Sequence, residues 1–315
     1  MIPEFFPRER YYCVLDEQPD FLVPPFTIEP DAGPEQTAPL VVNPRCWLAW
    51  HGPLPPALNA AATWHGNLFD FEWTIWVDDP DRGTLWPYWL GPRYAGLLED
   101  FVPGQLYEGG LPPDVVDQLR AAGILVTPDT AQRRRHTWAR MVEQAAPLLD
   151  RGYVQLSGLL PPFHVGSLRR YYRYHTRMGT FALGDNQTPG RYVAYDELAT
   201  KYIQQQLARM VSDVARRVVV PSYNYLAFYQ GGATLDPHTD REACEYTLSL
   251  CIDATPDPQT YGAWPLLLMT GEGAISLTQG IGEALLFRGR DLTHWRDRLP
   301  EGYTSSSILF HYVNA

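Results

Sequence analysis

From Val218 to its C-terminus, the chain is a series of short apolar runs separated by turns. Runs such as "EYTLSLCID", "PLLLM", "EALLF" and "SSSILFHYV" have the length and the β-branched or aromatic content of strands. The stretch before them is helical: residues 201–217 place Ile203, Leu207, Met210, Val211 and Val214 on one stripe. Helices followed by strands predict an α+β domain in which helices buttress a β-sandwich.

The segments upstream divide the chain near residue 130. "LPPDVVDQLRAAGILV" predicts a short helix that starts at its prolines, stops at Gly123 and leads into a strand. A longer helix is expected to follow through Leu149, then a strand in "RGYVQLSGLLPP" and a helix in "FHVGSLRRYYRYH". We therefore expect an N-terminal accessory or substrate-recognition region, residues 1–130, and a catalytic domain, residues 131–315.

Tryptophan and proline mark the N-terminal region. Seven of the ten tryptophans lie between Trp47 and Trp89, and residues 18–60 are rich in proline. The segment "NLFDFEWTIWV" alternates well enough for one or two strands. The tryptophan cluster is more typical of a core or domain contact than of a ligand platform.

Composition narrows the class of protein. The chain has 315 residues, is 45% hydrophobic and carries a net charge of −11. Because nucleic-acid binding needs a basic face, we expect no nucleic-acid partner. The N-terminus lacks the pattern of a signal peptide, and no run approaches the ~18–20 apolar residues of a membrane span. The four cysteines form no CxxC pair, which indicates reduced thiols in a cytoplasmic protein.

The stretch "DPHTD" suggests a metal site. His238 and Asp240 are two residues apart, so in an extended chain both side chains project on one face. His294, 54 residues after Asp240, follows a polar turn at Gly289 and supplies a third donor. Two histidines and one carboxylate form a facial triad that leaves three adjacent positions open on six-coordinate Fe(II). Zinc also binds such a set, and His-x-Asp occurs by chance, so zinc and purely structural roles stay open here.

Six other histidines compete as donors, and we expect most of them to be structural: His51, His65, His136, His164, His175 and His311.

Residues 150–315 resemble the Fe(II)/2-oxoglutarate-dependent oxygenases, specifically their prolyl-hydroxylase-like branch. The resemblance rests on "YQGGATLDPHTD", on "GEALLF" ahead of the distal histidine, and on the His-x-Asp…His spacing. It implies a double-stranded β-helix (jelly-roll) catalytic domain, with His238, Asp240 and His294 as the iron ligands. The implied cofactors are Fe(II), the cosubstrate 2-oxoglutarate and O2.

The expected cosubstrate anchor departs from this resemblance. Members of the superfamily normally carry an Arg or Lys about ten residues after the second histidine, where this chain has "EGYTSSSIL". Arg296 is the first candidate to replace it, because it lies two residues after His294 and so faces the same side of a continuing strand. Arg288 and Arg241 are the alternatives.

Hydroxyl groups complete the predicted cosubstrate pocket. Ser305 or Ser307 is expected to keep the hydroxyl contact that often accompanies the basic residue. Tyr225 and Tyr229, on one face of the same strand, are expected to donate phenol hydrogen bonds or to pack in the core.

The resemblance implies a dioxygenase that couples decarboxylation of 2-oxoglutarate to oxidation of a substrate C–H bond. The intact Asp240 favours hydroxylation, because halogenases of the superfamily replace this carboxylate with a small residue. The altered anchor leaves open a non-catalytic or 2-oxoglutarate-independent, cupin-like metal-binding protein. The substrate is expected to be a peptide, held by an N-terminal region that loosely resembles leader-peptide-binding winged helices, or an amino acid or natural product.

Overall fold

The structure is a computed structural model that describes residues 39–52, 74–90, 94 and 96–315. It divides into two compact units: Met1–Arg140 with Pro161–Tyr171, and Met141–Leu160 with Tyr172–Ala315. The predictions for most of the proline-rich stretch, for the start of "NLFDFEWTIWV" and for His65 and Cys13 lie outside the described residues.

The first unit is built on a small antiparallel sheet, in the order β2-β3-β4. Its described elements are β1 (Val41–Val42), β2 (Cys46–Leu48), the 3-10 helix η2 (Ala49–His51), β3 (Thr74–Asp79), β4 (Thr84–Trp89), α3 (Pro113–Ala121) and β5 (Leu125–Val126). Strand β1 pairs with β5. Helix α3 begins at Pro113 and ends before Gly123, whose φ of 74° suits a glycine, so this predicted helix–stop–strand is confirmed.

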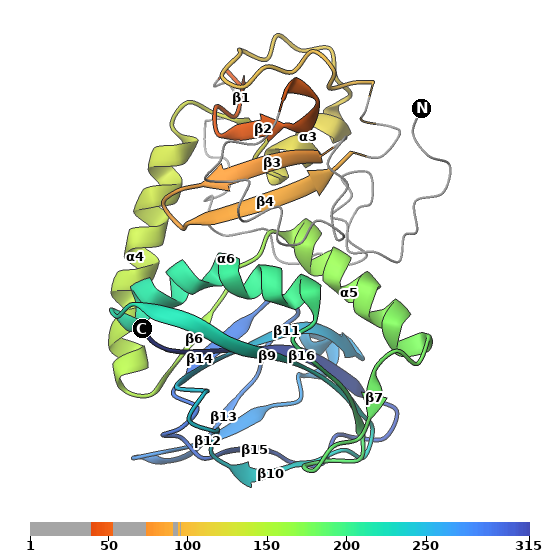
Figure 1. The fold of residues 1–315 in the computed structure, drawn as a ribbon, viewed down its shortest axis with the longest axis vertical. Coiled ribbons are helices and arrows are strands. Elements are labelled where there is room, and N and C mark those ends of the chain that lie inside the picture. The colour runs from red at the N-terminus through yellow and green to blue at the C-terminus, as the bar shows by residue number, and fades with distance from the viewer. Residues whose placement is uncertain (1–38, 53–73, 91–93, 95) are drawn as a thin grey trace. The chain divides into compact units, whose positions relative to one another are not determined.

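The second unit carries two antiparallel sheets. The larger has the order β6 (Tyr153–Leu156), β14 (Ala284–Phe287), β11 (Tyr246–Thr255), β16 (Thr304–Asn314), β9 (Val219–Gln230), β8 (Arg191–Tyr195), β7 (Ala182–Leu183). The smaller has the order β10 (Leu235–His238), β15 (His294–Arg296), β12 (Leu266–Thr270), β13 (Gly273–Leu277). Figure 1 shows the two sheets as separate layers. This mixed α/β architecture with antiparallel sheets is consistent with the predicted jelly roll.

Helices α4 (Thr130–Asp150), α5 (Pro162–Arg177), α6 (Leu198–Ala215) and α7 (Pro258–Tyr261) complete the described elements. The predicted apolar stripe of α6 is buried. This helix lies against the larger sheet (Figure 1), where the Gln204 side chain donates to the Tyr223 carbonyl and the Gln204 carbonyl accepts from the Tyr312 hydroxyl. The sheet is therefore held on one face by a helix, which leaves its other face for the smaller sheet.

Apolar and polar side chains share the space between the two sheets. Leu266 and Leu268 of β12 pack with Leu285 and Phe287 of β14. Strand β11 adds polar side chains beside them, because its residues alternate in direction: Thr247 and Ser249, the register partners of Phe287 and Leu285, face the side opposite to Leu248 and Leu250. The space between the sheets therefore holds polar groups next to its apolar packing.

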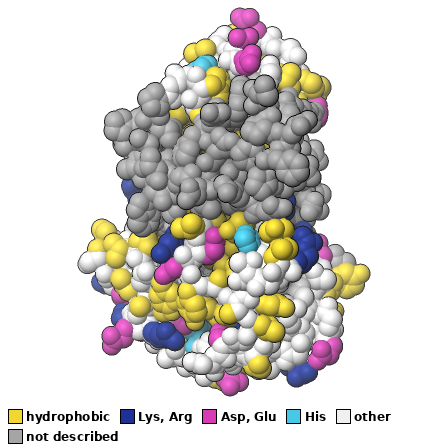
Figure 2. All heavy atoms as spheres, turned by 45° about the vertical axis from the view of Figure 1, so that its right-hand side comes forward, with side chains coloured by type: hydrophobic (Ala, Val, Ile, Leu, Met, Phe, Trp, Pro, Cys, Tyr) yellow, Lys and Arg dark blue, Asp and Glu magenta, His cyan; other side chains and the backbone are white. Residues whose placement is uncertain are grey.

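No described helix has the length and apolarity needed to span a membrane. On the face shown in Figure 2, hydrophobic, acidic and basic side chains are interspersed over the second unit, which we call the strand-rich unit.

Candidate metal and cosubstrate site

Two adjacent strands of the smaller sheet bring the predicted metal ligands together. His238 ends β10 and His294 begins β15, and the two residues are partners in the register of these strands. Their ring centroids are 4.3 Å apart. Asp240 Oδ1 lies 3.9 Å from His238 Nε2 and 3.6 Å from His294 Nε2. The predicted turn after Gly289 therefore does deliver His294 to the start of a strand, opposite His238.

Backbone carbonyls fix which nitrogen of each imidazole is available. His238 Nδ1 lies 2.8 Å from the Asp236 carbonyl oxygen, and His294 Nδ1 lies 3.0 Å from that of Leu292. A carbonyl only accepts, so each Nδ1 carries the proton and each Nε2 keeps its lone pair. Burial lowers the pKa of His294, which further favours the neutral ring. Both Nε2 atoms therefore keep a lone pair that a metal ion could accept, and both face Asp240.

Asp240 is oriented by a chain of hydrogen bonds behind it. Its Oδ2 accepts from the Thr247 hydroxyl at 2.6 Å, which leaves Oδ1 for a metal. The Thr247 oxygen lies 3.0 Å from His311 Nδ1. Since Thr247 donates its proton to Asp240, His311 must donate to Thr247. Burial lowers the pKa of His311 to about 4, so this ring is neutral at pH 7 and holds Thr247 without competing for the metal.

Gly289 leaves the space that Asp240 occupies. A Cβ atom at this position would lie 2.6 Å from Thr247 Oγ1 and 2.9 Å from the Cys244 carbonyl oxygen, and closer still to Asp240 Oδ2. Its carbonyl also accepts from the Asp240 amide at 2.9 Å. The turn thus needs glycine for close approach to the carboxylate.

The three donors fit an octahedral or tetrahedral metal ion. Their ligand atoms lie within 4.8 Å of one another. Metal–ligand bonds of about 2.1 Å require cis donors about 3 Å apart, a distance that small side-chain rotations reach from here. Asp240 and His311 also lie near Cys244, but Cys244 Sγ is 3.1 Å from the Tyr223 hydroxyl, and burial raises the pKa of this thiol. The set of His238, Asp240 and His294 is therefore the better candidate for a metal site.

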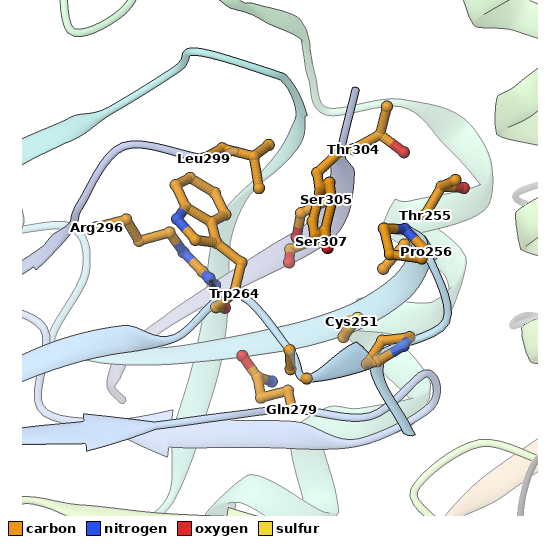
Figure 3. Close-up of a pocket in the computed structure, with 15 residues that line it drawn as sticks. Cys251, Thr255, Pro256, Trp264, Gln279, Arg296, Leu299, Thr304, Ser305 and Ser307 are labelled. Carbon is orange, nitrogen blue, oxygen red and sulfur yellow. Dashed lines mark hydrogen bonds between the residues drawn. The ribbon is translucent and has the colours of Figure 1, made fainter. Parts of the chain in front are cut away.

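Arg296 lies on the same side of β15 as His294, and both residues are buried, at 7% and 2% exposure. Its Nη1 donates to the Trp264 carbonyl at 2.7 Å, and its guanidinium lies 4.7 Å from the centre of the Trp264 ring (Figure 3). Burial lowers its pKa, and no described carboxylate pairs with it. A buried guanidinium without an acidic partner is suited to bind a carboxylate ligand.

Arg296 and the three candidate metal ligands line one cavity of about 210 Å³. Other predicted residues that line it are Ser307, Tyr225, Tyr229 and Arg241. Ser305 lines instead a smaller cavity of about 20 Å³, which Arg296 and Ser307 also line (Figure 3).

Arg288 is placed away from this cavity. It follows the inward-facing Phe287 at the end of β14, so its side chain projects outward. Its guanidinium lies 3.9 Å from carboxylate oxygens of Asp150 and Asp291. Of the described residues that the sequence predicts for the site, the three ligands, two arginines, one serine and two tyrosines line the cavity, whereas Arg288 lies outside it.

Four residues of the site were not foreseen in these roles: Gly289 as a spacer, Thr247 and His311 as supports for Asp240, and Arg191, which lines the cavity from β8. Thr247 and His311 are partners in the register of β11 and β16. A pairing between strands 64 residues apart has no local sequence signal, but the inward face of Thr247 follows from the alternation of β11.

No family model and no curated protein matches the chain. Several solved structures do. A Pseudomonas putida prolyl-4-hydroxylase matches at 16% identity over 56% of this chain and 100% of its own, with a TM-score of 0.46. A prolyl hydroxylase from Trichoplax adhaerens, in complex with a hypoxia-inducible-factor peptide, matches at 17% identity over 57% and 91%, with a TM-score of 0.48.

HygX from Streptomyces hygroscopicus, solved with nickel and 2-oxoglutarate, matches at 12% identity over 55% of this chain and 87% of its own, with a TM-score of 0.43. These matches are to Fe(II)/2-oxoglutarate oxygenases, prolyl hydroxylases among them, and at under 20% identity they bear on the fold alone.

Proposed function

We propose that the chain is a non-haem Fe(II)- and 2-oxoglutarate-dependent dioxygenase that hydroxylates an unactivated C–H bond. The observation that carries the proposal is the pairing of two features in one cavity. Two imidazoles with fixed tautomers and one carboxylate place their donor atoms close together. A buried guanidinium, which has no described acidic partner, lies on the same strand as His294. A metal alone would explain the first feature and leave the second without a purpose.

His238, Asp240 and His294 would hold the iron and leave three adjacent positions for cosubstrate and O2. When bound, iron and 2-oxoglutarate supply the oxidising chemistry. Arg296 binds the distal carboxylate of 2-oxoglutarate, and the buried Ser307 adds a hydroxyl. Because Asp240 is retained, halide has no vacant ligand position, which supports hydroxylation.

Apolar side chains form part of the cavity wall and reduce the space for water beside the candidate ligands. Leu266, Phe287 and Leu309 line it beside the ligands. Their presence strengthens the attraction between Arg296 and a carboxylate, because charges interact more strongly where water is excluded.

Anaerobic titration tests the proposed activity. Wild-type protein with Fe(II) under nitrogen is expected to develop a weak visible charge-transfer band when 2-oxoglutarate is added, and to release succinate slowly once air is admitted. Zn(II) in place of Fe(II) should give neither signal. Absence of both the band and succinate would favour the non-catalytic or cupin-like alternative.

The substrate we propose is a peptide, an amino acid or a natural product, with residues 1–130 as the accessory or recognition region. Support for a substrate reaching the metal comes from the rim of the cavity. Tyr195 is exposed, lines the cavity and packs against Tyr225 with ring centroids 4.6 Å apart. An aromatic rim of this kind suits a ligand with apolar surface. Product analysis by mass spectrometry with candidate peptides and amino acids would separate these classes.

The variant Arg296→Met tests the cosubstrate anchor. Removing a buried charge without a described acidic partner is expected to leave Tm unchanged or to raise it, by roughly 2–4 °C for each kcal/mol gained. The same variant should lose the rise in Tm that 2-oxoglutarate gives the Fe(II)-loaded wild type, because the ligand no longer binds. Thermal melts under nitrogen, with and without 2-oxoglutarate, measure both effects.

Arg298→Met is the matched control, since Arg298 lies two residues further on, is exposed and pairs with Glu301. It should keep the 2-oxoglutarate-dependent rise. If Arg296→Met also keeps it, the anchor moves to Arg241, the other predicted arginine that lines the cavity.

A further inference from the structure

Arg191 is a buried arginine of the cavity that no sequence motif indicated. It begins β8 and is the register partner of Tyr229 in β9. Its side chain is 3% exposed, although it lines the same cavity as the metal ligands. A guanidinium in this position either binds a ligand itself or acts through its neighbours, and its hydrogen bonds distinguish the two.

The hydrogen bonds of Arg191 are made to protein groups. Nε donates to Asp185 Oδ2 at 2.9 Å, and Nη2 donates to the same oxygen and to Gln187 Oε1 at 2.6 Å. Nη1 donates to the Tyr229 hydroxyl at 2.6 Å. Burial would raise the pKa of Asp185, but hydrogen bonds from Tyr225, the Thr188 amide and Arg191 outweigh it and lower that pKa to about 2. Arg191 is thus paired with an aspartate, whereas Arg296 has no acidic partner among the described residues.

This arrangement separates the roles of the two tyrosines that face the cavity. The Tyr225 hydroxyl donates its proton to Asp185 Oδ2. The Tyr229 oxygen accepts from Arg191, so its own proton must be donated elsewhere, and the described residues provide no acceptor for it. Of the two predicted phenol donors, only Tyr229 keeps a proton for a ligand in the cavity.

Tyr229 is also the tyrosine next to the cosubstrate anchor. Its ring packs edge-on against Trp264, with centroids 5.0 Å apart, and the Arg296 guanidinium lies 4.7 Å from the centre of the same Trp264 ring. Tyr229 and Arg296 line the same cavity. A carboxylate bound to Arg296 therefore lies beside a hydroxyl whose orientation is set by Arg191.

We propose that Arg191, held by Asp185, is a positioning residue that presents the Tyr229 hydroxyl as a hydrogen-bond donor to the cosubstrate carboxylate bound by Arg296. The proposal rests on the proposed function, because it needs a carboxylate ligand at Arg296. It requires that Arg191 act only through Tyr229, which makes the effects of changing the two residues non-additive.

A double-mutant cycle tests this. Tyr229→Phe and Arg191→Met are each expected to weaken 2-oxoglutarate binding to the Fe(II) protein about 10-fold, the loss typical of a hydrogen bond to a charged group. The combined variant should be no weaker than Tyr229→Phe alone. Fe(II) affinity without 2-oxoglutarate should stay within twofold of the wild type. The readouts are the charge-transfer band titrated under nitrogen, and iron binding measured separately.

Arg191→Met leaves Asp185 buried without its partner, so a second variant guards against misfolding. Asp185→Asn with Arg191→Met removes both charges while Tyr225 keeps an acceptor, and it should show the same loss. Arg209→Met on α6, where Arg209 is exposed and pairs with Asp213, controls for the substitution itself.

Additive losses in the double-mutant cycle, or unchanged 2-oxoglutarate affinity in Tyr229→Phe, would overturn the proposal. Both results require a wild type that forms the charge-transfer band. A wild type without the band would instead refute the proposed function, so the two failures are distinguishable.

Discussion

Replacing Asp240 with alanine is expected to abolish Fe(II) binding and turnover without unfolding the strand-rich unit. The carboxylate Oδ1 is the donor that both histidine Nε2 atoms face, at 3.6 and 3.9 Å. Its loss leaves two imidazoles, which hold the ion far less tightly. Because changes behind a metal ligand already cost 10- to 100-fold, removal of the ligand should reduce iron affinity by more than about 100-fold. Equilibrium dialysis of Fe(II) under nitrogen, followed by a succinate assay, measures both losses.

The fold should survive this change because Asp240 lies in a loop outside the apolar core. Among the described residues its side chain accepts one hydrogen bond, from the Thr247 hydroxyl, and the backbone bond from its amide to the Gly289 carbonyl does not depend on it. The metal-free variant should therefore melt within a few degrees of the metal-free wild type.

Asp236→Ala is the matched control: Asp236 is exposed on β10, and its backbone carbonyl, which the substitution keeps, is the group that holds His238. It should bind Fe(II) as the wild type does. A collapse of the metal-free Asp240→Ala variant would show that Asp240 is structural and would contradict the site.

Local geometry explains why the first layer of this site is predictable from the sequence. Residues two apart on a strand face the same way, which is enough to join His238 with Asp240 and His294 with Arg296. The same rule separates Thr247 from Leu248 on β11. The rule cannot tell which of several arginines faces inward unless a residue of known direction lies nearby on the same strand. The sequence therefore leaves Arg288 as an alternative anchor, whereas the structure places it near Asp150 and Asp291, away from the cavity.

The supporting layer of the site could not be predicted, because it depends on which strands become neighbours. His311 supports Asp240 only because β16 pairs with β11 in one particular register, and Arg191 reaches Tyr229 only because β8 pairs with β9. Both pairings join segments distant in the sequence. Asp185, which neutralises Arg191, lies in the loop between β7 and β8, where polar residues give no signal of burial.

Gly289→Ala is expected to weaken metal binding without changing any candidate ligand. The added methyl group would occupy the position of Asp240 Oδ2 and press on Thr247 Oγ1, at 2.6 Å. The carboxylate is the more flexible neighbour, so we expect it to rotate away and to lose both its hydrogen bond from Thr247 and its position facing the two Nε2 atoms. Iron affinity should fall about 10- to 100-fold, as for other losses of support behind a metal ligand. Anaerobic Fe(II) titration measures the fall.

The stability cost of Gly289→Ala should be modest and separable from its effect on iron. The Cys244 carbonyl, 2.9 Å from the added atom, is backbone and must shift slightly, which costs about 1–3 kcal/mol, typical of overpacking. Gly271→Ala is the control, since a Cβ there meets nothing within 4 Å; its iron affinity should equal that of the wild type. If Gly289→Ala stays folded and binds Fe(II) with wild-type affinity, the carboxylate of Asp240 does not need the position described here and is not a metal ligand. If it behaves as expected, a residue that touches no metal sets the affinity of the site, because the space it leaves is the space the ligand requires.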